Sequence, residues 1–342
     1  MAFNHSTRVL VTGGAGFIGS WLIHKLNERG IEDIVIADFL GADEKWRNLV
    51  PLSFADYLDA ADLLKALDSG RLGNFDLVLH MGACSSTTEL DAGYLMQNNY
   101  EFTRELAECS VRSGARFVYA SSAATYGDGS AGMEDSSDLT YLRRLRPLNM
   151  YGYSKHLFDL YAARNGLLQR CVGIKYFNVF GPNEQHKGEM RSVVNKAYTQ
   201  IQETGSIRLF RSYCNDYRDG EQKRDFVYVK DAAEMTLHLA ENEQAAGIFN
   251  VGGGRSETWV DLAKAVFAAM KREPRIEFID MPEEMRTNYQ YATLADLARL
   301  RASGYDSPVT PLADAVGDYV TEYLAKAKSP ATTPPVARDE EA

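Results

Sequence analysis

A tyrosine and a lysine four positions apart are the residues of this chain best suited to proton transfer. Tyr151 and Lys155 occur in the run Tyr-Gly-Tyr-Ser-Lys, which places both side chains on one face of a helix. An ammonium beside a phenol lowers the phenol pKa from about 10, so Tyr151 becomes a usable general base. Ser122 directly follows a strand-like run and can hydrogen-bond the same substrate oxygen. The three residues predict a site that takes a proton from a substrate hydroxyl.

A glycine-rich turn near the N-terminus predicts the second reactant. The apolar run 8–12 passes into Gly13, Gly16 and Gly19, and apolar residues then recur at helical spacing. Such a strand, turn and helix lets a pyrophosphate approach the backbone at the helix N-terminus. We predict a dinucleotide whose nicotinamide takes a hydride from the substrate carbon. The glycine motif alone also fits an ordinary turn.

The end of the next strand-like run bears on which dinucleotide binds. Asp38 lies nineteen residues after Gly19, where a carboxylate accepts hydrogen bonds from the adenosine ribose and favours NAD. Lys45 and Arg47 follow in the same loop and can pair with a 2′-phosphate, although either can be ordinary surface. The residues therefore leave NAD and NADP both open.

Alternating strand-like and helical segments predict the scaffold that positions these residues. Strand-like segments occur at 8–12, 33–38, 74–80, 115–121 and 171–177, with helical patterns between them, including 59–67, 94–112 and 149–168. This alternation predicts an α/β fold, a Rossmann-type doubly wound parallel sheet with a smaller mixed α/β substrate-binding domain. We place the dinucleotide-binding domain at 1–177 with a segment returning near 225–251, the mainly substrate domain at 178–327, and a disordered tail at 328–342.

The composition argues against several classes of binding partner. With 37 basic and 47 acidic residues the formal net charge is −10, which opposes non-specific binding to nucleic acid or an anionic membrane. The four cysteines are far apart and suit a reducing compartment. His80 and Cys84 have a ligand-like spacing, but two groups do not make a metal site. We expect a cytoplasmic protein with no bound metal and no nucleic-acid or membrane partner.

The combined motifs resemble the extended short-chain dehydrogenase/reductase family, many of whose members modify sugar nucleotides. Segment 12–19, Ser122 and segment 151–155 carry the resemblance, which covers residues 8 to about 325. Further runs are similar to the branch that inverts C6 of ADP-D-glycero-β-D-manno-heptose, an inner-core sugar precursor of lipopolysaccharide: 81–88, 121–127, 176–188 and 223–229. The resemblance implies an isomerase with tightly bound NADP, or NAD, assembled as a homopentamer.

The implied chemistry agrees with the residues. A secondary carbinol C–H is not acidic, so inversion requires oxidation to a C6 ketone, followed by return of the hydride to either face. No net redox change occurs, and the cofactor remains bound. By resemblance, Tyr151 and Lys187 are the two acid–base groups, and Lys155 holds the nicotinamide ribose.

The resemblance also implies the binding residues. The cofactor would contact the glycine turn, Asp38, Lys155 and Lys187, together with Phe17, Ile18, Phe39, Lys45, Met81, Gly82, Ala83, Cys84, Ser85, Asn98 and Val179. The substrate would contact Ser122, Asn178, Glu189, Lys196, Phe210, Arg211, Ser212, Tyr213, Arg224 and Tyr289. Arg224 would hold the ADP phosphates through its fork of donors, although pairing with Asp225 is an alternative. Asn178 as a turn cap, and Phe210 and Tyr289 as core residues, are further alternatives.

Some positions depart from the enterobacterial pattern. Segments 135–146 and 212–222 are longer, Glu189 and Lys196 replace other polar residues, and Ala60 replaces a lysine associated with NADP. These departures leave the exact sugar nucleotide and the cofactor open.

Three other functions agree less well with the sequence. A 4,6-dehydratase carries Asp-Glu behind its catalytic hydroxyl, where this chain has Ala123 and Ala124, and UDP-hexose 4-epimerases lack the run at 186–188. A non-catalytic dinucleotide sensor, from a different functional class, has no need of Tyr151, Lys155 and Ser122 together.

Overall fold

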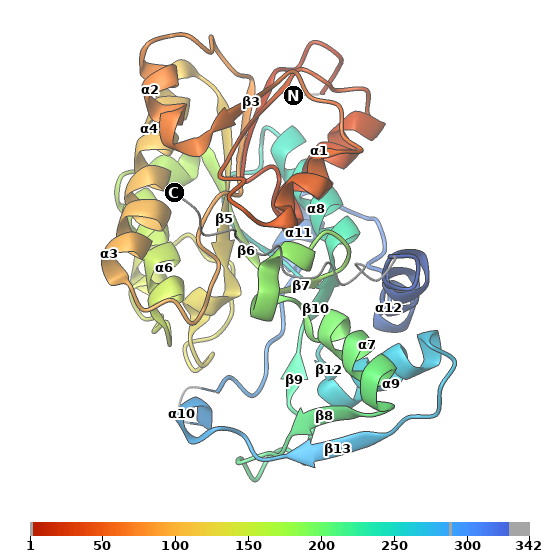
Figure 1. The fold of residues 1–342 in the computed structure, drawn as a ribbon. Coiled ribbons are helices and arrows are strands. Elements are labelled where there is room, and N and C mark those ends of the chain that lie inside the picture. Colours follow the sequence, from red (N-terminus) through yellow and green to blue (C-terminus); the bar gives the residue numbers. More distant parts are fainter. Residues whose placement is uncertain (1–2, 287–288, 328–342) are drawn as a thin grey trace, which may run out of the picture.

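A parallel sheet covered on both faces forms the larger part of the molecule (Figure 1). The computed structural model describes residues 3–286 and 289–327, and within them the main sheet has seven strands in the order β11-β6-β5-β4-β1-β2-β3. The strands are β1 (Val9–Thr12), β2 (Ile34–Asp38), β3 (Asp56–Asp59), β4 (Leu77–His80), β5 (Arg116–Ser122), β6 (Cys171–Tyr176) and β11 (Gly247–Val251). This arrangement confirms the predicted doubly wound α/β class.

The sequence of the strands explains their burial. Strands β1, β2 and β4 are nearly continuous runs of Val, Ile and Leu, and every residue in them is buried. Such runs suit a parallel sheet because helices cover both of its faces. Helices α1 (Phe17–Glu28) and α8 (Val229–Glu241) cover one face, and α2 (Leu63–Asp68), α4 (Phe102–Ser113) and α6 (Met150–Arg164) cover the other (Figure 1).

Several element boundaries differ from the sequence prediction. The edge strand β3 was not predicted, because its sequence Asp-Tyr-Leu-Asp has little apolar content and pairs only with β2. The helix predicted over 94–112 consists of α3 (Ala92–Leu95), a π-helical stretch η3 (Met96–Glu101) and α4. The pattern of residues 189–202 also predicts a helix, but the observed helix α7 (Val193–Thr204) begins at Val193 because the 3₁₀ turn η6 (Gln185–Met190) precedes it.

Smaller sheets build the part of the molecule below the main sheet in Figure 1. Strand β8 (Ile207–Phe210) pairs with β13 (Ile276–Ile279), β9 (Lys223–Arg224) with β12 (Glu257–Thr258), and β7 (Asn178–Phe180) with β10 (Phe226–Tyr228). The remaining helices are α5 (Leu139–Leu142), α7 (Val193–Thr204), α9 (Trp259–Ala269), α10 (Glu283–Arg286), α11 (Ala298–Ala302) and α12 (Leu312–Asp318).

The predicted domain boundaries remain predictions, although β11 does lie beside β6 in the main sheet. The tail predicted at 328–342 lies outside the described residues. In the part of the chain that the structure describes, no helix has both the length and the apolar content to cross a bilayer.

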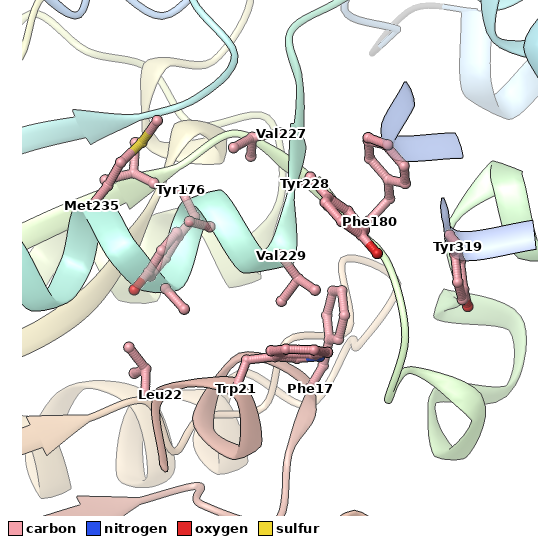
Figure 2. Packing of buried hydrophobic residues seen from close by; sticks show 14 of the residues in the cluster. Phe17, Trp21, Leu22, Tyr176, Phe180, Val227, Tyr228, Val229, Met235 and Tyr319 are labelled. Atoms are coloured by element: carbon pink, nitrogen blue, oxygen red, sulfur yellow. The ribbon is translucent and has the colours of Figure 1, made fainter. Parts of the chain in front are cut away.

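An aromatic cluster connects the first helix to the lower part of the molecule (Figure 2). Phe17 and Trp21 of α1 lie next to Val229 of α8, and Phe180 packs against Tyr228 at 5.6 Å between ring centroids. Burial of each large apolar side chain contributes about 1.5–3 kcal/mol. The indole Nε1 of Trp21 also donates to the carbonyl of Pro182 at 3.0 Å. The loop after β7 is thereby held against the start of α1.

The glycine turn generates a stability prediction. A Cβ on Gly19 would lie 2.1 Å from the carbonyl oxygen of Gly13, so Gly19→Ala should destabilise the fold by about 2 kcal/mol. Gly317 of α12 is the matched control, because a Cβ there meets nothing within 4 Å and alanine should stabilise the helix by about 0.5–1 kcal/mol. Urea unfolding of both variants measures the effects. Equal stability of the two would contradict the close packing.

Candidate functional site

A cleft of about 580 Å³ lies at the carboxyl ends of the central strands. Residues that end or follow β1, β2, β4 and β5 line it, as expected for ligand sites in such sheets. All the predicted cofactor residues and the predicted catalytic residues Ser122, Tyr151, Lys155 and Lys187 are among its lining residues. The structure therefore brings them together, and their roles remain predictions.

The glycine turn forms a cradle at one end of the cleft. Gly13 has a φ of +67°, and a Cβ on it would lie 2.6 Å from the amide nitrogen of Gly82. Gly16 is the N-cap of α1 and has no side chain to accept from the first-turn N–H groups. Those groups remain available to an anionic group, so the geometry fits a pyrophosphate.

Buried Asp38 and partly buried Lys45 form an ion pair in the cleft. The Asp38 carboxylate accepts from the amides of Ala15 at 2.9 Å and Phe39 at 2.7 Å, and from Lys45 Nζ at 2.7 Å. Arg47, the other predicted phosphate partner, is exposed and pairs with Glu44. Of the two basic residues predicted in this loop, only Lys45 lines the cleft.

His80 has a structural role beneath the cleft. Its Nδ1 lies 2.6 Å from Thr12 Oγ1 and its Nε2 lies 2.8 Å from Thr103 Oγ1, so the ring connects β1, β4 and α4. Burial lowers the pKa of His80 to about 3, and the ring is neutral at physiological pH. The described residues contain no group of three or more His, Cys, Asp or Glu arranged to hold a metal ion.

Asn99 supports the cofactor loop and was missed by the sequence analysis. It is fully buried, accepts from the Cys84 amide at 2.9 Å, and donates to the Cys84 carbonyl at 2.9 Å and to Ser154 at 3.1 Å. These bonds tie the loop after β4 to α6. Asn99 lies in the π-helical stretch, for which the sequence carries no local signal.

Helix α6 places the predicted catalytic pair. Asn149 caps the helix by accepting from the Gly152 amide at 2.8 Å, and Tyr151 and Lys155 both line the cleft. Burial raises the pKa of Tyr151, although its hydrogen bond with Ser122 lowers it. Burial also lowers the pKa of Lys155 to about 8. The prediction that the pKa of the Tyr151 phenol is lowered is thus wrong for the protein without ligands. Sequence spacing shows that Tyr151 and Lys155 share a helix face, but it does not show that folding removes both side chains from water.

A buried ion pair lies behind this helix. Asp159 is one turn beyond Lys155 and contacts Lys175 Nζ at 3.0 Å, with both side chains fully buried. Its carboxylate also accepts from Tyr119 at 2.9 Å and from Ser121 at 2.8 Å. Asp159 therefore fixes the end of β5, where Ser122 begins its turn, against α6. A single aspartate in a helix carries no motif, and the sequence analysis missed it.

Lys187 reaches the cleft from a short loop. It lies in the 3₁₀ turn η6 (Gln185–Met190), and its Nζ is 5.0 Å from the centre of the Phe17 ring. Burial lowers the pKa of Lys187, whereas the charge of Glu184 raises it. The next residue, Gly188, has a φ of +53°, a conformation that favours glycine.

Arg224 and Tyr289 meet outside the cleft lining. The Arg224 guanidinium is 5.0 Å from the centre of the Tyr289 ring and 5.5 Å from that of Trp259. Trp259 Nε1 donates to the Tyr289 hydroxyl at 3.0 Å, which fixes this aromatic cage. Asp225 accepts instead from backbone amides, including that of Ala295 at 2.9 Å. The two rings and a hydrogen bond from Arg224 Nη1 to the Lys223 carbonyl at 2.8 Å hold the guanidinium, and its role with the ADP phosphates remains a prediction.

The other predicted substrate residues, apart from Ser122, also lie outside the cleft lining. Apart from Ser122, none of them is among its lining residues: Asn178, Glu189, Lys196, Phe210, Arg211, Ser212, Tyr213, Arg224 and Tyr289. Glu189 pairs with Lys196 at 3.3 Å on the surface, and the Tyr213 hydroxyl donates to Asp280 at 3.1 Å. The structure therefore does not bring these residues into the cleft lining, and their roles in substrate binding remain predictions.

The two longer segments have different surroundings. Segment 135–146 packs on the sheet edge, where Ser137 Oγ accepts from the Ile248 amide at 2.9 Å and Asp135 accepts from the Asn250 amide at 3.2 Å. Segment 212–222 closes on itself, since the Ser212 amide donates to Asp219 at 2.8 Å. Only the second borders the region of Arg224.

Asp159 generates a prediction on stability. Asp159→Asn leaves two lysine side chains buried without their carboxylate, and the cost should be about 3–5 kcal/mol. Asp68→Asn, at the exposed end of α2, makes the same change of charge and should shift stability by less than about 0.5 kcal/mol. Urea unfolding of both variants tests this, and similar midpoints would contradict it.

The chain is similar to known proteins over more than nine-tenths of its length. The NAD dependent epimerase/dehydratase family matches residues 9–252. The ADP-L-glycero-D-manno-heptose-6-epimerase of Nitratidesulfovibrio vulgaris (strain Hildenborough) is 54% identical over 319 residues, covering 93% of this chain and 98% of the relative. The protein of the same name from Fusobacterium nucleatum is 42% identical over 329 residues, covering 94% and 99%.

Solved structures of sugar-nucleotide epimerases are also similar to this chain. The Helicobacter pylori ADP-L-glycero-D-manno-heptose-6-epimerase has a TM-score of 0.76 at 26% identity, covering 93% of this chain and 96% of that one. The Thermus thermophilus UDP-glucose 4-epimerase complex with NAD has a TM-score of 0.73 at 25% identity, covering 94% and 100%. The chain belongs to the NAD dependent epimerase/dehydratase family and groups there with the ADP-L-glycero-D-manno-heptose-6-epimerases.

Proposed function

We propose that this chain converts ADP-D-glycero-β-D-manno-heptose to ADP-L-glycero-β-D-manno-heptose in lipopolysaccharide inner-core biosynthesis. The observation that carries the proposal is one cleft lined by Ser122, Tyr151, Lys155 and Lys187 beside a glycine cradle, in a chain 54% identical to a named heptose epimerase. The cradle at Gly13 and the uncapped start of α1 fit a nicotinamide dinucleotide, which supplies a hydride acceptor and donor when bound.

The chain's own residues account for the proton transfers. Ser122 holds the C6 oxygen while Tyr151 takes its proton, and the carbon gives up a hydride to form a ketone. The hydride then returns to C6 and a proton returns to the oxygen, so atoms and electrons balance without net oxidation. C6 lies outside the sugar ring, and rotation about the bond to the ring presents its second face. Lys187 is the proposed acid–base group for that face.

The charge of Lys155 supports the tyrosinate. With its pKa near 8, the lysine is mostly protonated at neutral pH and its positive charge is available to stabilise Tyr151 after deprotonation. Burial opposes charge on both side chains, so the pair depends on the nearby carboxylate of Asp159, which raises the pKa of Lys155.

Tyr151 generates the prediction that tests the reaction. Tyr151→Phe should keep the fold and the bound cofactor but lose at least about 100-fold in epimerase rate, because the general base is absent. Proton NMR of ADP-D-glycero-D-manno-heptose incubated with the purified protein, without added cofactor, follows the C6 epimer. Tyr153→Phe, an exposed tyrosine on the same helix, is the control and should retain activity. Wild-type turnover of UDP-glucose but not ADP-heptose would overturn the proposed substrate.

NADP is the proposed cofactor, on the strength of Lys45. Its ammonium lies 2.7 Å from Asp38, at the position where an adenosine ribose and its 2′-phosphate would approach. The lysine offsets the charge of the aspartate that would otherwise repel the phosphate. Ala60 lines the same cleft and supplies no second charge there.

Lys45→Ala should weaken NADP binding by about tenfold or more and change NAD binding much less. Arg47→Ala, which removes a neighbouring charge paired with Glu44, should leave both affinities nearly unchanged. Titration calorimetry of cofactor-stripped protein measures all the constants. Equal losses for the two cofactors would show that Lys45 does not select the phosphate.

The family resemblance also supports a proposal for the oligomeric state and the cellular compartment of the protein. We propose a cytoplasmic homopentamer that binds neither nucleic acid nor membrane, in keeping with a net charge of −10. Light scattering of the purified chain tests the pentamer, and a mass other than about five subunits would exclude it.

A further inference from the structure

A single buried carboxylate holds the loop that carries Lys187. Glu184 is fully buried, and its Oε1 accepts from Ser192 Oγ at 2.5 Å and from the Tyr319 hydroxyl at 3.0 Å. Its Oε2 accepts from the Ser192 amide at 2.6 Å. Burial raises the pKa of Glu184, whereas these hydrogen bonds and the charge of Lys187 lower it. A carboxylate without solvent is stable only with such donors around it.

These contacts tie together three segments of the chain. Ser192 is the N-cap of α7, and Tyr319 begins the C-terminal helical segment η7 (Tyr319–Leu324). Asn195 of α7 donates to the Tyr319 hydroxyl at 2.8 Å, which closes the network. The Lys187 amide donates to the carbonyl of Glu184 at 3.0 Å. Glu184 thus holds the loop at its start through the backbone and at its end through the side chain.

The charge of Glu184 affects the pKa of Lys187. Burial lowers the pKa of Lys187, and the charge of Glu184 opposes that effect. The neighbouring His186 is neutral at physiological pH, because burial lowers its pKa to about 4. Lys45 is paired with Asp38, and Arg191 donates through Nε to the Gly188 carbonyl at 2.8 Å. Phe17, on the other side, offers only its ring.

We propose that Glu184 is a positioning residue for Lys187, fixing its loop and keeping its ammonium charged in the cleft. Glu184 is not among the lining residues of the cleft, so it acts through Lys187 and not on the substrate. The inference rests on the acid–base role proposed for Lys187. Its electrostatic part, however, can be measured without any reaction.

The direct test is the titration of Lys187 in the full chain with bound dinucleotide. Lysine labelled with ¹³C at Cε gives one resonance per side chain, and Lys187→Arg assigns the resonance of Lys187. Glu184→Gln removes the opposite charge with little change of shape, so the pKa of Lys187 should fall further below its ordinary value. Glu203→Gln, an exposed carboxylate on α7, is the matched control and should leave the titration unchanged. An unchanged Lys187 titration in Glu184→Gln overturns the proposal, even if the variant is less stable.

Glu184→Met combined with Tyr319→Phe keeps the proposal testable if Glu184→Gln does not fold. The double variant removes the carboxylate together with one hydroxyl that would otherwise lose its acceptor, so the pKa of Lys187 should fall as it does in Glu184→Gln. A Lys187 titration identical to wild type in the double variant overturns the proposal.

Activity separates this inference from the proposed function. If both hold, Glu184→Gln should reduce kcat by about tenfold at pH 8 and move its alkaline limb to lower pH by the same amount as the Lys187 titration. The KM for ADP-heptose should change much less. Full turnover by Lys187→Ala would remove Lys187 from the mechanism, and a wild-type protein inactive on ADP-heptose would refute the proposed substrate. Neither result alters what the titration says about Glu184.

Discussion

The ion pair between Asp159 and Lys175 is the interaction on which the catalytic end of the sheet depends. Both side chains are fully removed from water, so each charge is stabilised by the other at 3.0 Å and by the hydroxyl groups around the pair. The same carboxylate receives the hydroxyls of Tyr119 and Ser121 from β5 and lies one turn beyond Lys155 on α6. One buried carboxylate therefore holds the end of β5, the neighbouring strand β6 and helix α6 in one arrangement.

A second buried carboxylate, that of Glu184, stabilises the part of the structure that brings Lys187 to the cleft. Glu184 is buried, and its hydrogen bonds join the loop of Lys187 to α7 and to the C-terminal segment. The aromatic cluster of Phe17, Trp21 and Phe180 packs this region against α1 (Figure 2). Because the glycine cradle lies at the start of α1, the cradle and the loop of Lys187 share a rigid support.

Much of the cleft was predictable from the sequence because parallel strands end at one edge of a sheet. Gly13, Asp38, Gly82 and Ser122 each end or closely follow a strand, and the topology alone brings them together. The edge strand β3 and the π-helical stretch over Met96–Glu101 were not predictable. Their residues lack a strong periodicity, and pairing with β2 and packing around Asn99 decide their conformation.

Spacing in the sequence determined the fold class, the cofactor cradle and the shared face of Tyr151 and Lys155, since each depends on local backbone geometry. It did not determine the charge state of that pair. The pKa of Tyr151 rises and that of Lys155 falls to about 8 because the folded chain buries both, and burial is a property of the whole packing. Asp159 lies in no motif, and the run 176–188 assigned no role to its member Glu184. Both residues matter because segments distant in sequence enclose them. The spacing of residues in the sequence therefore indicated the type of reaction. Only the tertiary structure showed which charged side chains are buried beside the reacting groups and how their pKa values change.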